Sequence, residues 1–180
     1  YTNGNPITKG LSDTFLFQFL GQGYIVGIPF PVIIMFIVFI VLYVLLHKTA
    51  FGKSVYAIGG NEKAAYISGV KLNKVKIIIY SISGIMASIS GLIITSRLSS
   101  AQPTAGASYE MDAIAAVVLG GTSLSGGKGR ILGTLIGALI IGVLNNGLNI
   151  IGVSAFWQQV VKGVVILIAV LIDRFKVVKQ

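Results

Sequence analysis

Apolar residues fill long, nearly uninterrupted stretches of this sequence and leave little room for amphipathic patterns. A membrane-spanning helix needs about 20 mostly apolar residues, and four stretches meet or approach that length: 28–46, 77–96, 131–150 and 155–172. A fifth stretch, 109–121, is apolar but short, so at about 1.5 Å per residue it would cross only part of the hydrocarbon core. The pattern predicts an all-α integral membrane protein, a polytopic helix bundle with one short or broken membrane segment.

Composition agrees with a lipid environment. Hydrophobic residues make up 54% of the 180 residues and charged residues 11%, whereas a soluble domain carries about 25% charge. The chain opens on Tyr1 in a polar loop with no signal-peptide pattern, so we expect a fragment of a longer protein. Without cysteine it has no disulfide or thiolate metal site. We expect neither a metal nor a cofactor.

The net charge of +9 would suit nucleic acid, but the distribution of the charge points to a membrane topology. Lys and Arg collect in cytoplasmic loops. Three segments are basic: the loop 47–76, the loop 121–130 and the tail 173–180. The segment 1–27 holds only Lys9 and Asp13 as charged residues. We therefore expect no nucleic-acid partner, an extracytoplasmic loop at 1–27, a transmembrane domain at 28–172 and a cytoplasmic tail at 173–180.

Whether the short segment 109–121 crosses the membrane decides on which side the C-terminal tail lies. If it re-entered the outer face, the basic tail would lie outside, against the positive-inside rule. We therefore predict that it crosses, with the Gly- and Ser-rich piece after Gly120 completing the passage in irregular form, where protein or a water-filled cavity must cover it. Ser108 is expected to cap this helix, and Glu110 and Asp112 to complement its dipole.

Small residues recur every four positions on two of the predicted spans, which allows helix backbones to approach closely. Ser83, Ala87 and Gly91 form one such series, and Gly133 and Gly137 form the other. We predict close helix packing at both. The alternative is that Gly and Ala are simply frequent in membrane helices.

The basic loop 47–76 contains a short stretch with helix-capping residues at both ends. Asn61 suits the N-cap, Glu62 the first turn, and Gly69 the left-handed position after a helix end. Asn73 is then expected to cap the following span. A short capped helix on the inner face is either a docking element for a cytoplasmic partner or an ordinary loop with one turn of helix. The residues concerned are Gly60, Asn61, Glu62, Lys63, Ala64, Ala65, Tyr66, Ile67 and Gly69.

Leu124-Ser125-Gly126-Gly127-Lys128 echoes the LSGGQ signature of ABC ATPases. A phosphate-binding P-loop requires G-x-x-x-x-G-K-[ST], but Gly129 follows Lys128 and Thr122 stands where the first Gly belongs. We interpret the match as a chance occurrence in a flexible, basic glycine loop. We expect the chain neither to bind nor to hydrolyse ATP.

Polar residues within apolar spans are costly unless they have partners, so they are functional candidates. We predict that Asn145, Asn146 and Gln158 line or adjoin a passage through the membrane, since amides both donate and accept hydrogen bonds. The alternative is that these amides bond neighbouring helices. Lys162 lies within two turns of the outer end of its span, and we expect it to snorkel to the interface.

The segment AIGGNEKAAYISGVKLNKVK closely resembles the long cytoplasmic loop of ribose-type ABC permeases, and so does the run from RLSSAQPTAGASYEMDAIAAVVLGG to the end of the last span. This resemblance to the ribose/simple-sugar importer family covers nearly the whole chain and includes spaced Gly, Asn and charged positions. It implies a multi-pass permease of the bacterial cell membrane, with a second permease copy or a paralogue beside it. It also implies a separate ABC ATPase below and an extracytoplasmic sugar-binding protein above.

The resemblance implies that residues 60–69 are the coupling helix that docks in a cleft of the ATPase, with ribose as the first substrate candidate. Alternatives within the superfamily are another sugar, a furanose autoinducer or branched-chain amino acids. A non-transporting structural membrane subunit is the alternative of another class. A membrane-embedded enzyme is disfavoured because no span has Asp or Glu in its middle and the single histidine, His47, stands at a helix end.

Overall fold

The computed structural model describes residues 15–178, with side chains through residue 171 except residue 169. Lys9 and Asp13 of the predicted extracytoplasmic loop, and the last two residues of the predicted basic tail, lie outside this range. The chain divides into two compact units, Tyr1–Val44 with Lys71–Ala107, and Leu45–Val70 with Ser108–Gln180. Each is described by itself below.

Three of the described helices are long and apolar enough to cross a membrane: α2 (Phe30–Lys48), α5 (Leu72–Leu98) and α7 (Ile131–Ile150). None of the residues of α2 is buried within the chain, as expected of a helix that faces lipid or other membrane segments. In α8 (Ala155–Val178) the apolar part is Ala155–Ile168. The sequence therefore placed these four helices correctly, with ends that differ from the predicted ones by up to six residues.

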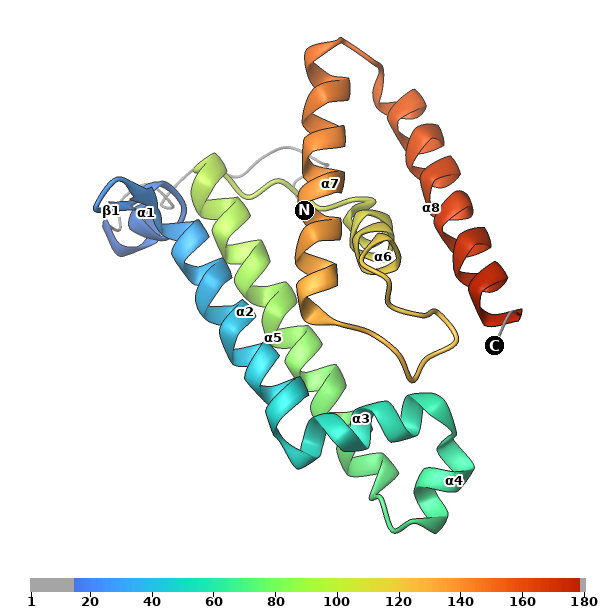
Figure 1. Ribbon diagram of the computed structural model, residues 1–180. Coiled ribbons are helices and arrows are strands. Elements are labelled where there is room, and N and C mark those ends of the chain that lie inside the picture. The colour runs from blue at the N-terminus through green and yellow to red at the C-terminus, as the bar shows by residue number, and fades with distance from the viewer. Residues whose placement is uncertain (1–14, 179–180) are drawn as a thin grey trace. The chain divides into compact units, whose positions relative to one another are not determined.

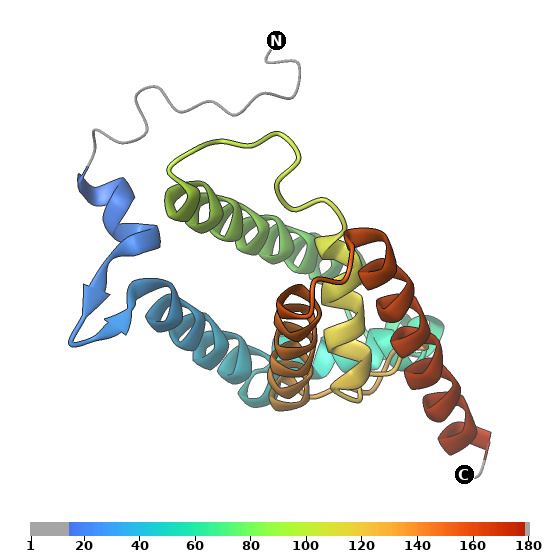
Figure 2. The same cartoon turned by 90° about the horizontal axis from the view of Figure 1, so that it is seen from above.

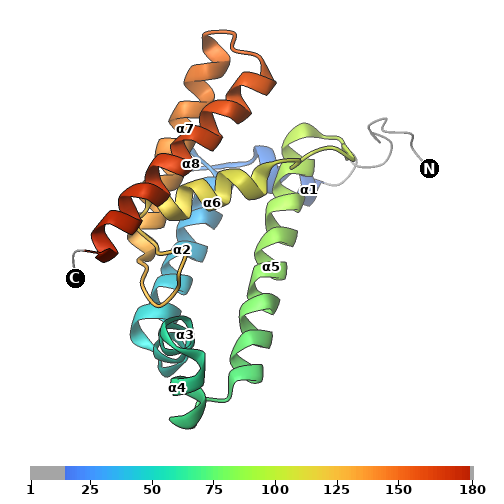
Figure 3. The same ribbon diagram turned by 90° about the vertical axis from the view of Figure 1, so that its right-hand side faces the viewer.

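In the first unit, α1 (Phe15–Gln22) packs on the C-terminal end of α5 (Figure 3). A Cβ on Gly21 would lie 2.4 Å from the backbone nitrogen of Arg97, so only glycine permits this approach. The Gln22 side chain donates hydrogen bonds to the carbonyl of Arg97 at 3.3 Å and to the Ser99 hydroxyl at 3.0 Å. The segment predicted as a plain loop thus contains a helix fixed to the end of α5.

The same unit contains a small hairpin. Strands β1 (Tyr24–Ile25) and β2 (Ile28–Pro29) pair antiparallel, with Ile25 opposite Ile28. The connecting residues Val26 and Gly27 both have positive φ, 52° and 80°, as a two-residue hairpin turn of type I′ requires. The all-α expectation holds for everything else that the structure describes.

The close packing predicted at the small residues of α5 has no partner among the described residues and stays a prediction. Ser83, Ala87 and Gly91 are exposed within the described chain, and a Cβ on Gly91 would meet nothing within 4 Å. Asn73 is also not a cap, because α5 begins at Leu72 with Lys71 in the N-cap position. The helix starts one turn earlier than the hydrophobic pattern suggests, so Asn73 lies inside its first turn.

In the second unit, α6 (Tyr109–Leu119) lies between α7 and α8 (Figures 1 and 2). The buried core of the unit is small: Ala115, Ala116 and Ile141, with Leu119 and Ile166 packed against it. Small side chains in α6 are what let two longer helices flank it, since they leave space for the neighbouring backbones.

Close packing on α7 is confirmed. A Cβ on Gly137 would lie 1.9 Å from the carbonyl oxygen of Ala116, and one on Gly133 would lie 2.0 Å from the carbonyl oxygen of Gly120. The two glycines therefore face the backbone of α6 along a continuous contact. The two segments run antiparallel here, because Ala116 of α6 meets Gly137 of α7 and Gly120, which follows α6, meets Gly133.

The N-terminal end of α6 differs from the prediction. Ser108 does stand in the N-cap position, but its φ is 69° and its side chain makes no cap hydrogen bond. The hydroxyl instead accepts a hydrogen bond from the Gln159 side chain of α8 at 3.4 Å. The Ser108 hydroxyl, which the capping pattern assigns to the N-terminus of α6, thus makes a tertiary contact with α8 in its place.

Candidate functional site: a capped helix, a glycine loop and a buried polar cluster

The segment after α2 forms two short helices that meet at one residue. These are α3 (Ala50–Gly60) and α4 (Glu62–Ile67). Asn61 ends the first and starts the second: its backbone N–H donates to the carbonyl of Ala57, while its side-chain oxygen accepts from the backbone N–H of Ala64 at 3.0 Å. The predicted N-cap at Asn61 is thus confirmed, and the same residue fixes a corner between the helices.

The end of α4 is also well defined. Gly69 has a φ of +84°, in the left-handed region that glycine adopts at little cost. The backbone N–H of Gly69 donates to the carbonyl of Tyr66 and that of Val70 to the carbonyl of Ala65, which satisfies the last carbonyls of the helix. A six-residue helix with both ends closed is a more rigid unit than an uncapped turn.

The side chains of α4 divide into an inner and an outer set. Ala65 is 4% exposed, whereas Tyr66 is 69% and Ile67 is 85% exposed. Ala65, one of the residues predicted to belong to the docking element, is therefore not available for contact with a partner. Ala64, Tyr66 and Ile67 remain as an exposed apolar tip, with Glu62 and Lys63 exposed beside them.

The glycine loop 121–130 packs against α3, as Figure 1 shows for the connection between α6 and α7. A Cβ on Gly126 would lie 2.4 Å from the carbonyl oxygen of Gly59, and one on Gly59 would lie 2.6 Å from the backbone nitrogen of Gly127. The hydroxyl of Tyr56 donates a hydrogen bond to the carbonyl of Gly129 at 2.8 Å. The glycine loop, whose sequence echoes an ATPase signature, therefore packs its backbone closely against α3, the helix that precedes α4.

A second polar site lies among α6, α7 and α8. Asp112 of α6 pairs with Lys162 of α8, with Oδ1 and Nζ 2.7 Å apart. The other carboxylate oxygen of Asp112 accepts a hydrogen bond from the amide nitrogen of Asn145 of α7 at 3.1 Å. The expectation that Lys162 snorkels to the interface is wrong: its side chain is 14% exposed and turns toward Asp112.

The three predicted passage residues are not brought together. Asn145 belongs to the polar cluster, Asn146 is exposed on α7, and Gln158 donates hydrogen bonds to Asn149 Oδ1 at 2.9 Å and to the carbonyl of Val153 at 2.8 Å. Gln158 thus stabilises the turn between α7 and α8. Sequence reasoning treated Asp112 only as a dipole partner and missed its ion pair, because the partner lies 50 residues further along the chain.

Together the features define a class: a polytopic helical membrane protein with a capped helix outside its spans and an ion pair among them. The permease component of the branched-chain amino acid transport system is the family that matches, over residues 2–170. The chain belongs to this family of membrane transport permeases.

Individual permeases share high sequence identity with this chain. The ribose import permease protein of Bacillus subtilis (strain 168) is 68% identical over 176 residues, 98% of this chain and 54% of the relative. The ribose import permease protein of Escherichia coli (strain K12) is 59% identical over 98% of this chain and 55% of its own length. The xylose transport system permease protein of Haemophilus influenzae is 50% identical over 82% and 39%. The chain thus spans about half the length of these relatives. No solved structure matches it.

Proposed function

We propose that this chain is half of the membrane-spanning subunit of an ATP-driven importer for a monosaccharide, with ribose as the first candidate. The observation that carries the proposal is the 68% and 59% identity to two ribose import permeases over 98% of the chain. Identity to the xylose permease is lower, at 50%. The bacterial cell membrane is the location that the long apolar helices and the family require.

In this proposal the chain does no chemistry of its own, and a separate ABC ATPase supplies the energy. Residues 60–69 form the coupling helix that docks on the ATPase. The exposed tip of Tyr66 and Ile67 supports this role, because an exposed apolar patch on a rigid element is suited to a protein partner. A secreted sugar-binding protein would deliver the substrate on the other side, and a second permease copy would complete the passage within the lipid bilayer.

Docking alone would not move the membrane helices, so the contact between α3 and the glycine loop matters for the mechanism. The corner at Asn61 joins α4 to α3, and the loop that rests on Gly59 continues directly into α7. A displacement of α4 by the ATPase would therefore reach α6 and α7 through closely fitted backbone. Both structural connections lie within one compact unit of the chain.

Uptake by the complete system tests the function. The full-length permease, its ATPase and its binding protein would be placed in proteoliposomes, and uptake of labelled ribose, xylose, allose and leucine would be compared. ATP-dependent uptake in which ribose is preferred supports the proposal. Preference for leucine or another solute overturns the substrate, and absence of any uptake by an assembled complex favours the structural-subunit alternative.

A pull-down tests the docking role. Tyr66→Ala with Ile67→Ala removes the exposed apolar tip without touching either helix cap, and Leu124→Ala, an exposed apolar residue in the glycine loop, is the matched control. We expect the double variant to lose most ATPase retention and sugar-stimulated ATP hydrolysis while the control keeps both. Normal retention by the double variant would place the docking surface elsewhere.

A further inference from the structure

The ion pair between Asp112 and Lys162 joins two helices, α6 and α8, whose residues are mostly apolar. Its two side chains are 20% and 14% exposed, and Asn145 Oδ1 is buried with no hydrogen-bond partner among the described residues. Charges in membrane helices are costly and almost always face a protein interior or a water-filled cavity. A cluster that served only to hold three helices together would be expected to satisfy all of its buried polar atoms.

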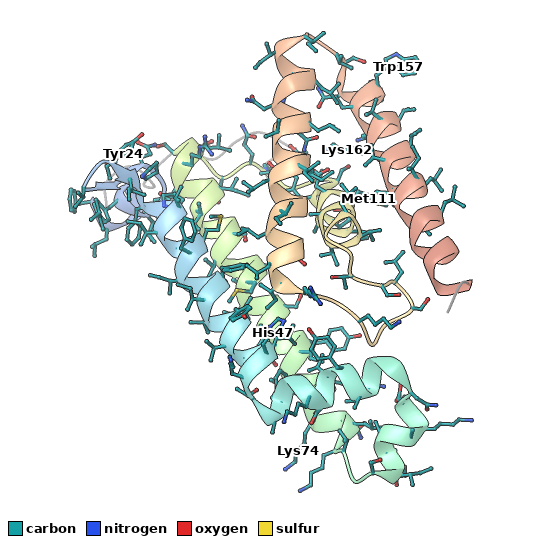
Figure 4. The ribbon with its side chains drawn as sticks, in the orientation of Figure 1. Tyr24, His47, Lys74, Met111, Trp157 and Lys162 are labelled. Atoms are coloured by element: carbon teal, nitrogen blue, oxygen red, sulfur yellow. The ribbon has the colours of Figure 1, made fainter. Side chains whose placement is uncertain are left out.

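A cavity of about 340 Å³ adjoins this pair between α6 and α8. Its volume is at the lower end of the range for small-molecule pockets, roughly 300–1,000 Å³. Figure 4 shows Met111 and Lys162 where these two helices come together. The lining residues combine polar and apolar groups: Ser108, Glu110, Met111, Gln159, Lys162, Gly163 and Ile166.

We propose that this cavity is a binding site for a polyhydroxylated ligand, a monosaccharide on its way through the permease, and that Lys162 and Gln159 contact its hydroxyl groups. The inference rests on the proposed function and deepens it. The Lys162 ammonium offers three donors, and the Gln159 amide and the Ser108 hydroxyl each donate and accept. Met111 and Ile166 offer apolar surface for the C–H face of a sugar ring.

Asp112 is a positioning residue in this site. One of its oxygens is occupied by Lys162 and the other by Asn145, so the carboxylate orients the ammonium and keeps it at the wall of the cavity. Weak binding of the substrate suits a transporter, because a passage must release its substrate as well as bind it. The polar groups of the cavity already have hydrogen-bonding partners within the protein. Each contact with a ligand therefore replaces an existing one, which favours weak binding.

Substrate protection is the first test. Gly163→Cys places a thiol on the cavity wall, and Ile151→Cys, an exposed position at the end of α7, is the control. Both would be made in the full-length permease with any other cysteine removed and reconstituted with its partners. Millimolar ribose should slow maleimide labelling of Gly163→Cys at least fivefold and leave Ile151→Cys unchanged. Equal labelling of Gly163→Cys with and without ribose overturns the site.

Kinetics of variants separate binding from a purely structural ion pair. Gln159→Leu lies outside the ion pair, and we expect it to raise the KM for ribose uptake about tenfold with little change in the maximal rate. The charge-exchanged pair Asp112→Lys with Lys162→Asp should restore insertion lost in Asp112→Lys alone, yet keep a raised KM because the ammonium no longer lines the cavity. A normal KM in Gln159→Leu, or in a well-inserted exchanged pair, overturns the proposal.

Failure of the binding site and failure of the proposed function give different results. Wild-type ribose uptake in the same proteoliposomes reports on the proposed function alone. Normal wild-type ribose uptake, together with unprotected Gly163→Cys and unchanged KM values, would remove the site and leave the function standing. Uptake of a different sugar, which also protects Gly163→Cys, would keep the class of ligand and replace only ribose.

Discussion

Gly59 of α3 and Gly126 of the glycine loop are in backbone contact, so close that a Cβ added to Gly126 would lie 2.4 Å from the carbonyl oxygen of Gly59. No amino acid other than glycine fits on either side without moving the loop. The contact connects the segment that bears α4 to the entrance of α7, and it is the most constrained point between them.

Gly59→Ala is the direct test of that contact. The added methyl group would meet the backbone nitrogen of Gly127 at 2.6 Å, and overpacking of this kind costs about 1–3 kcal/mol. We expect the loop to separate from α3. The permease should then still retain the ATPase, while its rate of sugar uptake falls severalfold. Gly147→Ala on α7 is the control, because its Cβ would meet nothing within 4 Å. Equal transport by the two variants would show that the contact does not transmit motion.

Tyr56→Phe removes the hydrogen bond to Gly129 and keeps the ring. A hydrogen bond of this kind contributes about 0.5–1.5 kcal/mol, so we expect a small decrease in the thermal stability of the purified permease. Tyr66→Phe is the control, since Tyr66 is 69% exposed on α4. A stability loss that is the same in both variants would contradict the assigned role of Tyr56.

Gly69→Val tests the closed end of α4. A β-branched residue at a φ of +84° is strained, so the turn after α4 should rearrange and weaken both ATPase retention and sugar-stimulated hydrolysis. Gly69→Asn is the control, because Asn tolerates the left-handed region. If Val and Asn behave alike, the left-handed conformation is not required for docking.

Gly137→Ala tests the packing of α6 on α7. The new Cβ would lie 1.9 Å from the carbonyl oxygen of Ala116, so we expect destabilisation of about 1–3 kcal/mol from overpacking. Gly142→Ala on the same helix meets nothing within 4 Å and should be neutral or slightly stabilising. The yield of folded permease after heating in detergent distinguishes the two, and a larger loss in Gly142→Ala would refute the packing.

Cysteines in the loop before α7 and at the end of α7 test the topology. The helix has 20 residues, about 30 Å at 1.5 Å per residue, which matches the hydrocarbon core. We expect Leu124→Cys to react from the cytoplasmic side, beside Lys128 and Arg130, and Ile151→Cys from the outside. Labelling of both from the same side of intact cells would exclude α7 as a span.

The sequence by itself determined the long helices, the caps of α4 and the glycine face of α7 that allows close packing, whereas α6 was identified as the packing partner only by the structure. Each of these depends on local information: an apolar run of about 20 residues, Asn61 three positions before the N–H that it caps, and glycines spaced four apart on one helix face. These signals act over a few turns of chain, so they can be read without knowing what lies opposite. The family match over residues 2–170 then placed the chain among membrane transport permeases.

Only the tertiary structure decided which polar groups meet. Lys162 had two physically reasonable positions, at the interface or inside, and the choice was made by Asp112 on a helix 50 residues earlier. The Ser108 hydroxyl likewise bonds Gln159 and does not cap its own helix. The sequence of the glycine loop indicates a flexible segment, but in the structure its backbone contacts Gly59 of α3. Such contacts join residues far apart in sequence, and their energies depend on the distance and burial of both partners, which no local pattern records.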